Sequence, residues 1–133
     1  MNPVSRPTVL IADDEPLIVA ALSRMIRRAG MSFISDTTGT HVLEMARTHQ
    51  PAVIILDVRQ RVDGRDLLMK LKKDPLTREI KVLMLSADED QFTRHVCLEL
   101  GAEDYEVKPF DVCFVNKLAR LAGVVVDGAA AHP

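Results

Sequence analysis

The sequence has few cysteines, no long apolar run and no excess of basic residues. The two cysteines, Cys97 and Cys113, lie far apart and neither belongs to a Cys-x-x-Cys motif, which argues against a metal or redox motif. We interpret both as reduced residues in or near packed helices. No stretch approaches the roughly 20 apolar residues that cross a bilayer, and residues 1–7 have no apolar core of the kind a signal peptide requires. We therefore expect a cytoplasmic protein that does not enter a membrane.

The balance of charge also excludes some partners. The net charge is −2 over 133 residues, so no basic field suggests that this domain itself binds nucleic acid. Hydrophobic residues make up 47% and charged residues 27% of the chain, as in an ordinary soluble globular domain. A chain of this length forms one domain with a proper core.

Five apolar runs alternate with five amphipathic segments along the chain. Strands are predicted at 8–12, 31–36, 53–57, 81–85 and 104–107. Helices are predicted from Pro16 to Gly30, around 42–50, around Leu67–Leu71 up to Asp74, through Phe92, Val96 and Leu100 up to Gly101, and from Asp111 through Leu121. The Met and Leu positions on these helices are interpreted as core positions.

Strict alternation of strands and helices predicts an α/β fold with a parallel sheet and helices on both faces. The expected architecture is a flavodoxin-like, doubly wound (βα)5 sandwich with strand order 2-1-3-4-5. We expect the folded domain to span residues 8–122, with a flexible arm at 1–7 and a flexible tail or linker stub at 123–133.

Polar side chains follow four of the five predicted strands. In a parallel sheet the carboxyl ends of all strands meet at one edge, where ligands bind. That edge should collect three carboxylates, a hydroxyl and an ammonium, from Asp13, Asp14, Asp57, Ser86 and Lys108. Asp57 stands out because it ends a run of four apolar residues, where a charge does not serve packing.

The chemistry of this group points to phosphoryl transfer. Three close carboxylates repel one another unless a cation lies among them, and an all-oxygen set favours a hard ion such as Mg2+. Lys108 supplies a positive charge and Ser86 a neutral hydrogen-bond donor. An acid nucleophile with these neighbours suits transfer of a phosphoryl group onto Asp57.

Four motifs together resemble the receiver domain of two-component response regulators, over about residues 8–122. They are Ile11-Ala12-Asp13-Asp14-Glu15-Pro16, Ile55-Leu56-Asp57, Leu85-Ser86-Ala87 and Tyr105-Glu106-Val107-Lys108-Pro109-Phe110. The resemblance implies a signal-transduction phosphoprotein in which Asp57 accepts a phosphoryl group from a sensor histidine kinase or a histidine phosphotransfer protein. It also implies a Lys108-Pro109 peptide bond in the cis form, which an amide before proline tolerates.

The resemblance further assigns a role to each site residue. It implies Mg2+ (or Mn2+) bound directly by Asp14 and Asp57, by Asp13 mainly through water, and by the carbonyl of Arg59. Lys108 and Ser86 would bind phosphoryl oxygens. Ser86 and Tyr105 would form a switch that alters the surface of the fourth helix, fifth strand and fifth helix, through which a homodimer is possible. That surface would control a downstream effector or output domain.

The loop after Asp57 departs from the family pattern. Relatives commonly carry a Met-Pro or Leu-Pro pair before an Asp-Gly that falls one residue later than here. This chain has Gln60-Arg61 and no proline. The loop is either an ordinary solvated one, or Arg59 faces the phosphoryl group or pairs with Asp88. An Arg59–Asp88 ion pair would screen the acyl phosphate and slow its hydrolysis.

Other function classes are less favoured. An aspartyl-phosphate phosphatase generally needs a second acid two residues after its nucleophile, where this chain has Arg59, so we do not expect an enzyme acting on small substrates. A flavodoxin-like cofactor binder is disfavoured by one Tyr, no Trp and no Gly/Ser/Thr-rich loop after the first strand. A phosphorylation-independent relative is disfavoured because every group the chemistry needs is present. A phosphorelay intermediate stays open, as does the choice between a stand-alone receiver and part of a longer regulator.

Overall fold

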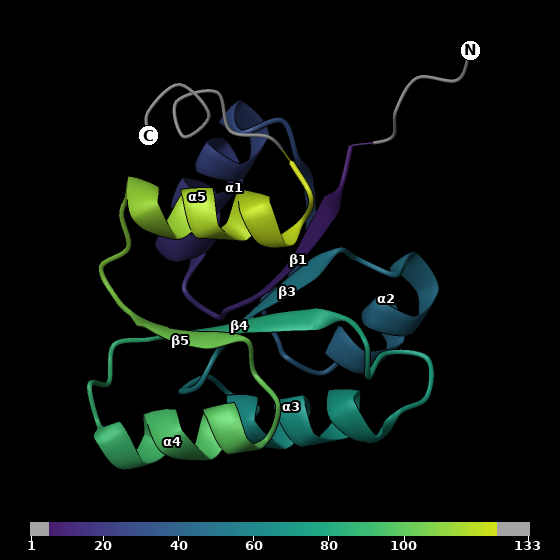
Figure 1. The fold of residues 1–133 in the computed structure, drawn as a ribbon, viewed down its shortest axis with the longest axis vertical. Helices are drawn as coiled ribbons and strands as arrows, with labels where there is room; N and C mark the ends of the chain where they lie inside the picture. Colours follow the sequence, from purple (N-terminus) through teal and green to yellow (C-terminus); the bar gives the residue numbers. More distant parts are fainter. Residues whose placement is uncertain (1–5, 125–133) are drawn as a thin grey trace.

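The computed structural model describes residues 6–124, which form five strands and five helices in strict alternation (Figure 1). The elements are β1 (Thr8–Ala12), α1 (Pro16–Arg28), β2 (Ser32–Asp36), α2 (Val42–His49), β3 (Val53–Asp57), α3 (Gly64–Lys73), β4 (Lys81–Ser86), α4 (Gln91–Glu99), β5 (Asp104–Val107) and α5 (Val112–Leu121). All strand pairs are parallel and the order is β2-β1-β3-β4-β5, so the predicted fold class and strand order are confirmed.

The sheet is covered on both faces, with α1 and α5 on one side and α2, α3 and α4 on the other (Figure 1). Alternate residues of each strand enter opposite cores because side chains alternate across a strand. In β3, Val53 and Ile55 pack toward α1 and α5, whereas Ile54 and Leu56 pack toward the other three helices. Two cores explain why this strand is apolar at four consecutive positions.

Helix ends follow ordinary capping chemistry. Pro16 is the first residue of α1, where a missing N–H costs nothing. The side chains of Asp63, Asp90 and Asp111 accept hydrogen bonds from the main-chain N–H groups that open α3, α4 and α5. The carboxylates therefore fix where the polar loops at the carboxyl edge of the sheet give way to helices.

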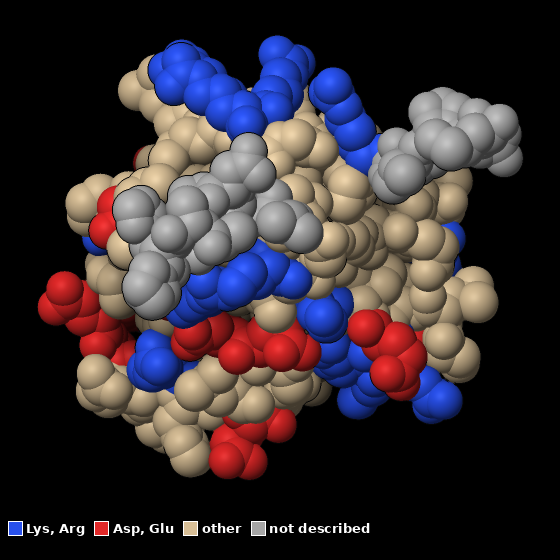
Figure 2. Space-filling view, turned by 45° about the horizontal axis from the view of Figure 1, so that its top comes forward, with Lys and Arg blue, Asp and Glu red and all other residues tan. Residues whose placement is uncertain are grey.

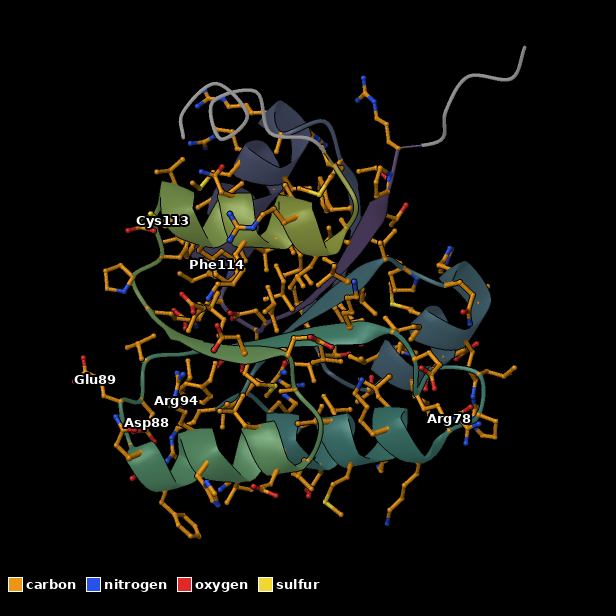
Figure 3. All side chains as sticks on the ribbon, in the orientation of Figure 1. Arg78, Asp88, Glu89, Arg94, Cys113 and Phe114 are labelled. Atoms are coloured by element: carbon orange, nitrogen blue, oxygen red, sulfur yellow. The ribbon has the colours of Figure 1, made fainter. Side chains whose placement is uncertain are left out.

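The expectation that the Met and Leu positions of the helices and the Phe92 stripe of the fourth helix lie in the core is wrong at some positions. Leu17 and Phe92 are 85% and 69% exposed. The buried positions of α4 are Thr93 and Cys97, one residue beyond the predicted Phe92–Val96 stripe. Cys97 is buried and Cys113 is exposed, both as free thiols. Figure 3 shows Phe114, which is buried, beneath α5 on the side of the sheet.

Most of the predicted arm and tail lies outside the described residues 6–124. Within that range no helix is long and apolar enough to cross a membrane.

Candidate functional site

The polar residues predicted from strand ends do lie together at the carboxyl edge of the sheet. Asp57 is the last residue of β3 and is buried next to β4, paired in register with Leu85. Asp13 and Asp14 follow β1, and one carboxylate oxygen from each of these three aspartates lies within 4.8 Å of the others. Asp13 is buried and Asp14 is exposed. The cluster is therefore closed on the protein side and open to solvent on the other.

Lys108 is the cation at the centre of this cluster. Its Nζ donates a hydrogen bond to Oδ2 of Asp57 (3.2 Å) and another to Oε1 of Glu15 (2.8 Å). Its side chain is 9% exposed. Burial alone would lower the pKa of Lys108, but the carboxylates of Glu15, Asp13 and Asp57 outweigh burial and raise it above the ordinary value. The ammonium is therefore permanently charged and is shared among three acids.

Glu15 is a site residue that the sequence reasoning missed. Its carboxylate lies closer to Nζ of Lys108 than that of Asp57 does, although 93 positions separate the two residues. The only local signal was that Glu15 follows the Asp13-Asp14 pair directly.

The site carries more negative charge than Lys108 neutralises. Burial raises the pKa of Asp57 from 3.8 to about 6, and the nearby Asp13 carboxylate adds to the rise, while Lys108 opposes it. Nζ of Lys108 also lies 3.1 Å from Oδ2 of Asp13, but outside hydrogen-bonding geometry, so this buried oxygen has no hydrogen-bond partner. An unsatisfied carboxylate oxygen is costly in a buried place.

These residues fit a hard divalent cation. Carboxylate oxygens are the ligands Mg2+ prefers, and it commonly binds through one or two of them while keeping several waters. The exposed Asp14 leaves room for such waters, and the orphaned oxygen of Asp13 is a free acceptor. Asp13, Asp14 and Asp57 are thus able to hold Mg2+ or Mn2+. The main-chain N–H of Arg59 donates to Oδ1 of Asp57 (3.1 Å), which brings the start of the next loop to the cluster.

Ser86 and Tyr105 lie beside the cluster, on β4 and β5. Ser86 is fully buried and its Oγ accepts a hydrogen bond from the N–H of Asp88 (3.1 Å). Tyr105 is also buried and its hydroxyl donates to the carbonyl oxygen of Asp88 (2.7 Å). Burial raises the pKa of Tyr105, with the Ser86 hydroxyl opposing. The side chains of Ser86 and Tyr105 therefore meet at one short loop, the β4–α4 connection. The Lys108-Pro109 bond, which follows β5, is cis, as predicted.

Arg59 forms the predicted ion pair with Asp88. Its Nη2 and Nε both donate to Oδ2 of Asp88 (2.5 and 3.0 Å). The guanidinium is 62% exposed and holds the pKa of Asp88 below its ordinary value. Figure 3 shows Asp88 and Glu89 in the connection that leads from β4 into α4. The pair ties the loop after Asp57 to the loop after Ser86.

Gln60 is a second residue of this loop that sequence reasoning did not assign. Its Nε2 donates to the carbonyl oxygens of Ala12 (3.1 Å) and Asp57 (2.9 Å), so one side chain bridges the ends of β1 and β3. Its Oε1 is buried without a partner. Gly64 closes the loop, and a Cβ there would lie 2.3 Å from the carbonyl oxygen of Asp57. Only glycine fits that close approach.

A chain of ion pairs covers the surface formed by α4, β5 and α5. Lys117 donates to Asp104 and to Glu106 (2.7 Å for the latter). Nη1 of Arg94, on α4, donates to the carbonyl oxygen of Tyr105 (2.7 Å), and the same guanidinium lies 3.5 Å from Asp104. Main-chain and charged contacts therefore connect Tyr105 to this surface.

Comparison with known proteins gives a consistent result. The family model described as "Response regulator receiver domain" matches residues 9–118. Among curated proteins, the alkaline phosphatase synthesis transcriptional regulatory protein PhoP of Bacillus subtilis is 35% identical over 126 residues, which are 94% of this chain and 51% of the relative. The transcriptional activator protein IrlR of Burkholderia pseudomallei is 39% identical over 125 residues, or 92% of this chain and 52% of the relative. The chain thus spans about half the length of these relatives.

Solved structures have the same fold. The receiver domain of Francisella response regulator 1452 superposes with a TM-score of 0.81 at 27% identity, covering 89% of this chain and 98% of that one. The receiver domain of the Pseudomonas aeruginosa sensor histidine kinase PA1611, described with a magnesium ion in its active-site cleft, gives 0.80 at 24% identity, covering 90% and 99%.

Proposed function

Since this chain belongs to the receiver domain family of two-component response regulators, we propose that Asp57 accepts a phosphoryl group from a phosphohistidine. The donor is a sensor histidine kinase or a histidine phosphotransfer protein. The observation that carries the proposal is the buried Asp57 carboxylate, hydrogen-bonded to Lys108 within a cluster of aspartates. Relatives in this family are signalling proteins, and PhoP and IrlR are by name transcriptional regulators.

The chemistry follows from the groups around Asp57. A carboxylate oxygen of Asp57 attacks phosphorus, the phosphorus–nitrogen bond of the donor breaks, and the imidazole nitrogen leaves with the electron pair. Lys108 stabilises a phosphoryl oxygen, because its ammonium already lies 3.2 Å from Oδ2 of Asp57. Ser86 offers its hydroxyl to another oxygen. Since transfer of this kind needs mainly positioning and charge neutralisation, these few groups suffice.

Asp13, Asp14 and Asp57, with the carbonyl of Arg59, would hold Mg2+ or Mn2+. A bound divalent cation supplies positive charge to the phosphoryl oxygens. Within the chain, Glu15 holds Lys108 by a hydrogen bond, and Oδ2 of Asp13 shares the Lys108 ammonium with two other carboxylates, so a further positive partner would be favourable there.

The output follows from Ser86 and Tyr105. When the Ser86 hydroxyl turns to a phosphoryl oxygen, it releases the N–H of Asp88, whose carbonyl holds Tyr105. Phosphorylation then shifts the population of conformers at the β4–α4 loop, and through Arg94 and Lys117 it alters the α4-β5-α5 surface. That surface would control an output partner or domain, including through a homodimer.

The test uses acetyl phosphate as donor. Incubation of the chain with acetyl phosphate and Mg2+ should add one phosphoryl group by intact mass, and EDTA should prevent it. Asp57→Ala should remain unmodified, while Asp66→Asn, an exposed aspartate on α3, should be modified like the wild type. An adduct that persists in Asp57→Ala contradicts the assignment.

A further inference from the structure

A cationic groove runs along α1 and the outer strand β2, on a part of the surface that the phosphoryl chemistry does not use. It has a volume of about 640 Å3 and includes Pro16 in its lining. Its lining combines the apolar residues Val19 and Ala20 of α1 and Phe33 of β2 with the exposed arginines Arg24, Arg27 and Arg28. Because β2 is at the edge of the sheet, no other element of residues 6–124 is hydrogen-bonded to its outer side.

The arginines on this groove have no acidic partners among residues 6–124. Arg24, Arg27 and Arg28, together with Arg6 just before β1, form no ion pair with any carboxylate of residues 6–124. Figure 2 shows basic side chains along the top of that view with no acidic side chains between them. The chain as a whole has a net charge of −2, so this is a local concentration of positive charge.

Helix stabilisation accounts for only part of this arrangement. Arg27 and Arg28 lie in the last turn of α1, where cations suit the helix dipole. Arg6 and Arg24 lie outside that turn. The guanidinium of Arg27 lies 5.0 Å from the centre of the Phe33 ring, so a cation–π contact fixes one charge directly over this ring. Arginine binds a carboxylate through two parallel hydrogen bonds and also stacks on aromatic rings, so these residues suit an acidic group that lies next to an apolar side chain.

We propose that this α1–β2 groove binds an acidic polypeptide segment, with carboxylates on the arginines and an apolar side chain against Phe33. Charge complementarity selects the acidic partner. Single-stranded nucleic acid needs several aromatic faces on which successive bases stack, and this groove offers one ring, over which Arg27 already lies, so a peptide is favoured. The proposal is independent of phosphoryl transfer at Asp57, since none of the groove arginines contacts the aspartate cluster.

The experiment measures fluorescence anisotropy of a labelled peptide in which glutamates flank one phenylalanine. Its glutamine counterpart and a single-stranded DNA oligonucleotide serve as competing probes. The wild-type chain should bind the acidic peptide, more weakly as salt rises. The triple variant Arg24→Gln/Arg27→Gln/Arg28→Gln should bind about tenfold more weakly or worse, because several charge-assisted contacts are lost together. Asp57→Ala should bind like the wild type.

A matched control removes three positive charges elsewhere. Lys70→Gln/Lys73→Gln/Arg78→Gln alters exposed residues on and after α3 and should change affinity less than about twofold. Single variants Arg24→Gln and Arg28→Gln give the same test if the triple variant does not fold by circular dichroism. The proposal is wrong if the peptide does not bind, if the control weakens binding as much, or if the oligonucleotide binds more tightly through the same arginines.

Discussion

The charge imbalance at Asp57 predicts that removing this charge stabilises the metal-free domain. The pKa of Asp57 is raised from 3.8 to about 6, first by burial and then by Asp13. Above about pH 6 the carboxyl is ionised in both folded and unfolded chains, and the folded state bears the full free-energy cost of burying the charge. As pH falls from about 6 to about 4, the folded state takes up the proton first, so the cost disappears. Asp57→Asn should therefore be more stable than the wild type above about pH 6, and this advantage should disappear by about pH 4.

The size of the effect follows from the shift. Two pKa units correspond to a ceiling of about 3 kcal/mol at neutral pH. Asparagine retains an oxygen that accepts from Lys108 but attracts the ammonium less, so we expect a gain of about 1–2 kcal/mol. Saturating Mg2+ should make the wild type the more stable of the two. A ligand at about 100 times its Kd stabilises the wild type by about 2.7 kcal/mol, whereas the variant lacks one carboxylate ligand.

Urea unfolding followed by far-ultraviolet circular dichroism is the suitable assay, because the chain has no Trp and one Tyr. In EDTA, the free energy of unfolding of Asp57→Asn should exceed that of the wild type at about pH 8 but not at about pH 4. The control Asp66→Asn removes an exposed charge and should change stability by less than about 1 kcal/mol at both. A variant no more stable than the wild type at about pH 8 would refute the reasoning, as would a gain that persists at about pH 4.

Two further predictions concern the short loop after Asp57. Arg59→Ala should shorten the lifetime of the phosphorylated chain by no more than about fivefold, since the ion pair with Asp88 is exposed and exposed pairs are weak. A lifetime equal to that of the control Arg61→Ala, followed by mass, would rule out screening. Gln60→Ala should lower the free energy of unfolding in urea by about 1–3 kcal/mol, because two main-chain carbonyls lose their donor. An unchanged midpoint of urea unfolding would contradict this and mean that water replaces the amide.

The fold and the main site could be predicted because both follow from regular patterns. A parallel sheet places all strand ends at one edge, so finding Asp57, Ser86 and Lys108 after successive strands was enough to bring them together. The two-sided core could be recognised in the same way, from four consecutive apolar residues in β3.

The buried face of α4 could not be predicted from apolar spacing. The pattern favoured Phe92 and Val96, yet the helix buries Thr93 and Cys97, a rotation of one residue. Thr93 tolerates burial because its hydroxyl donates to Oδ2 of Asp90 (2.9 Å), the residue that caps the helix. A polar residue satisfied by a cap is not distinguishable from a solvent-facing one by periodicity alone.

Contacts made by long side chains across the sheet edge could likewise not be predicted from residue spacing. Glu15 reaches Lys108 and Gln60 reaches the end of β1 because of where the loops fold back, not because of any spacing. A proline-free loop after Asp57 suggested a departure from relatives, but not that a glutamine amide would bridge two strands.

The single positive charge of Lys108 is too little for the carboxylates around it. This charge is divided among Glu15, Asp57 and Asp13, which leaves Oδ2 of Asp13 unsatisfied and the pKa of Asp57 raised. Both features are signs of the same missing positive charge, so a divalent cation would relieve both at once. Phosphorylation adds negative charge at Asp57, so Lys108 is attracted more strongly to Asp57 than to the more exposed Glu15. The ammonium should therefore move from Glu15 toward the phosphoryl group, and Glu15, the N-cap residue of α1, becomes sensitive to the state of Asp57.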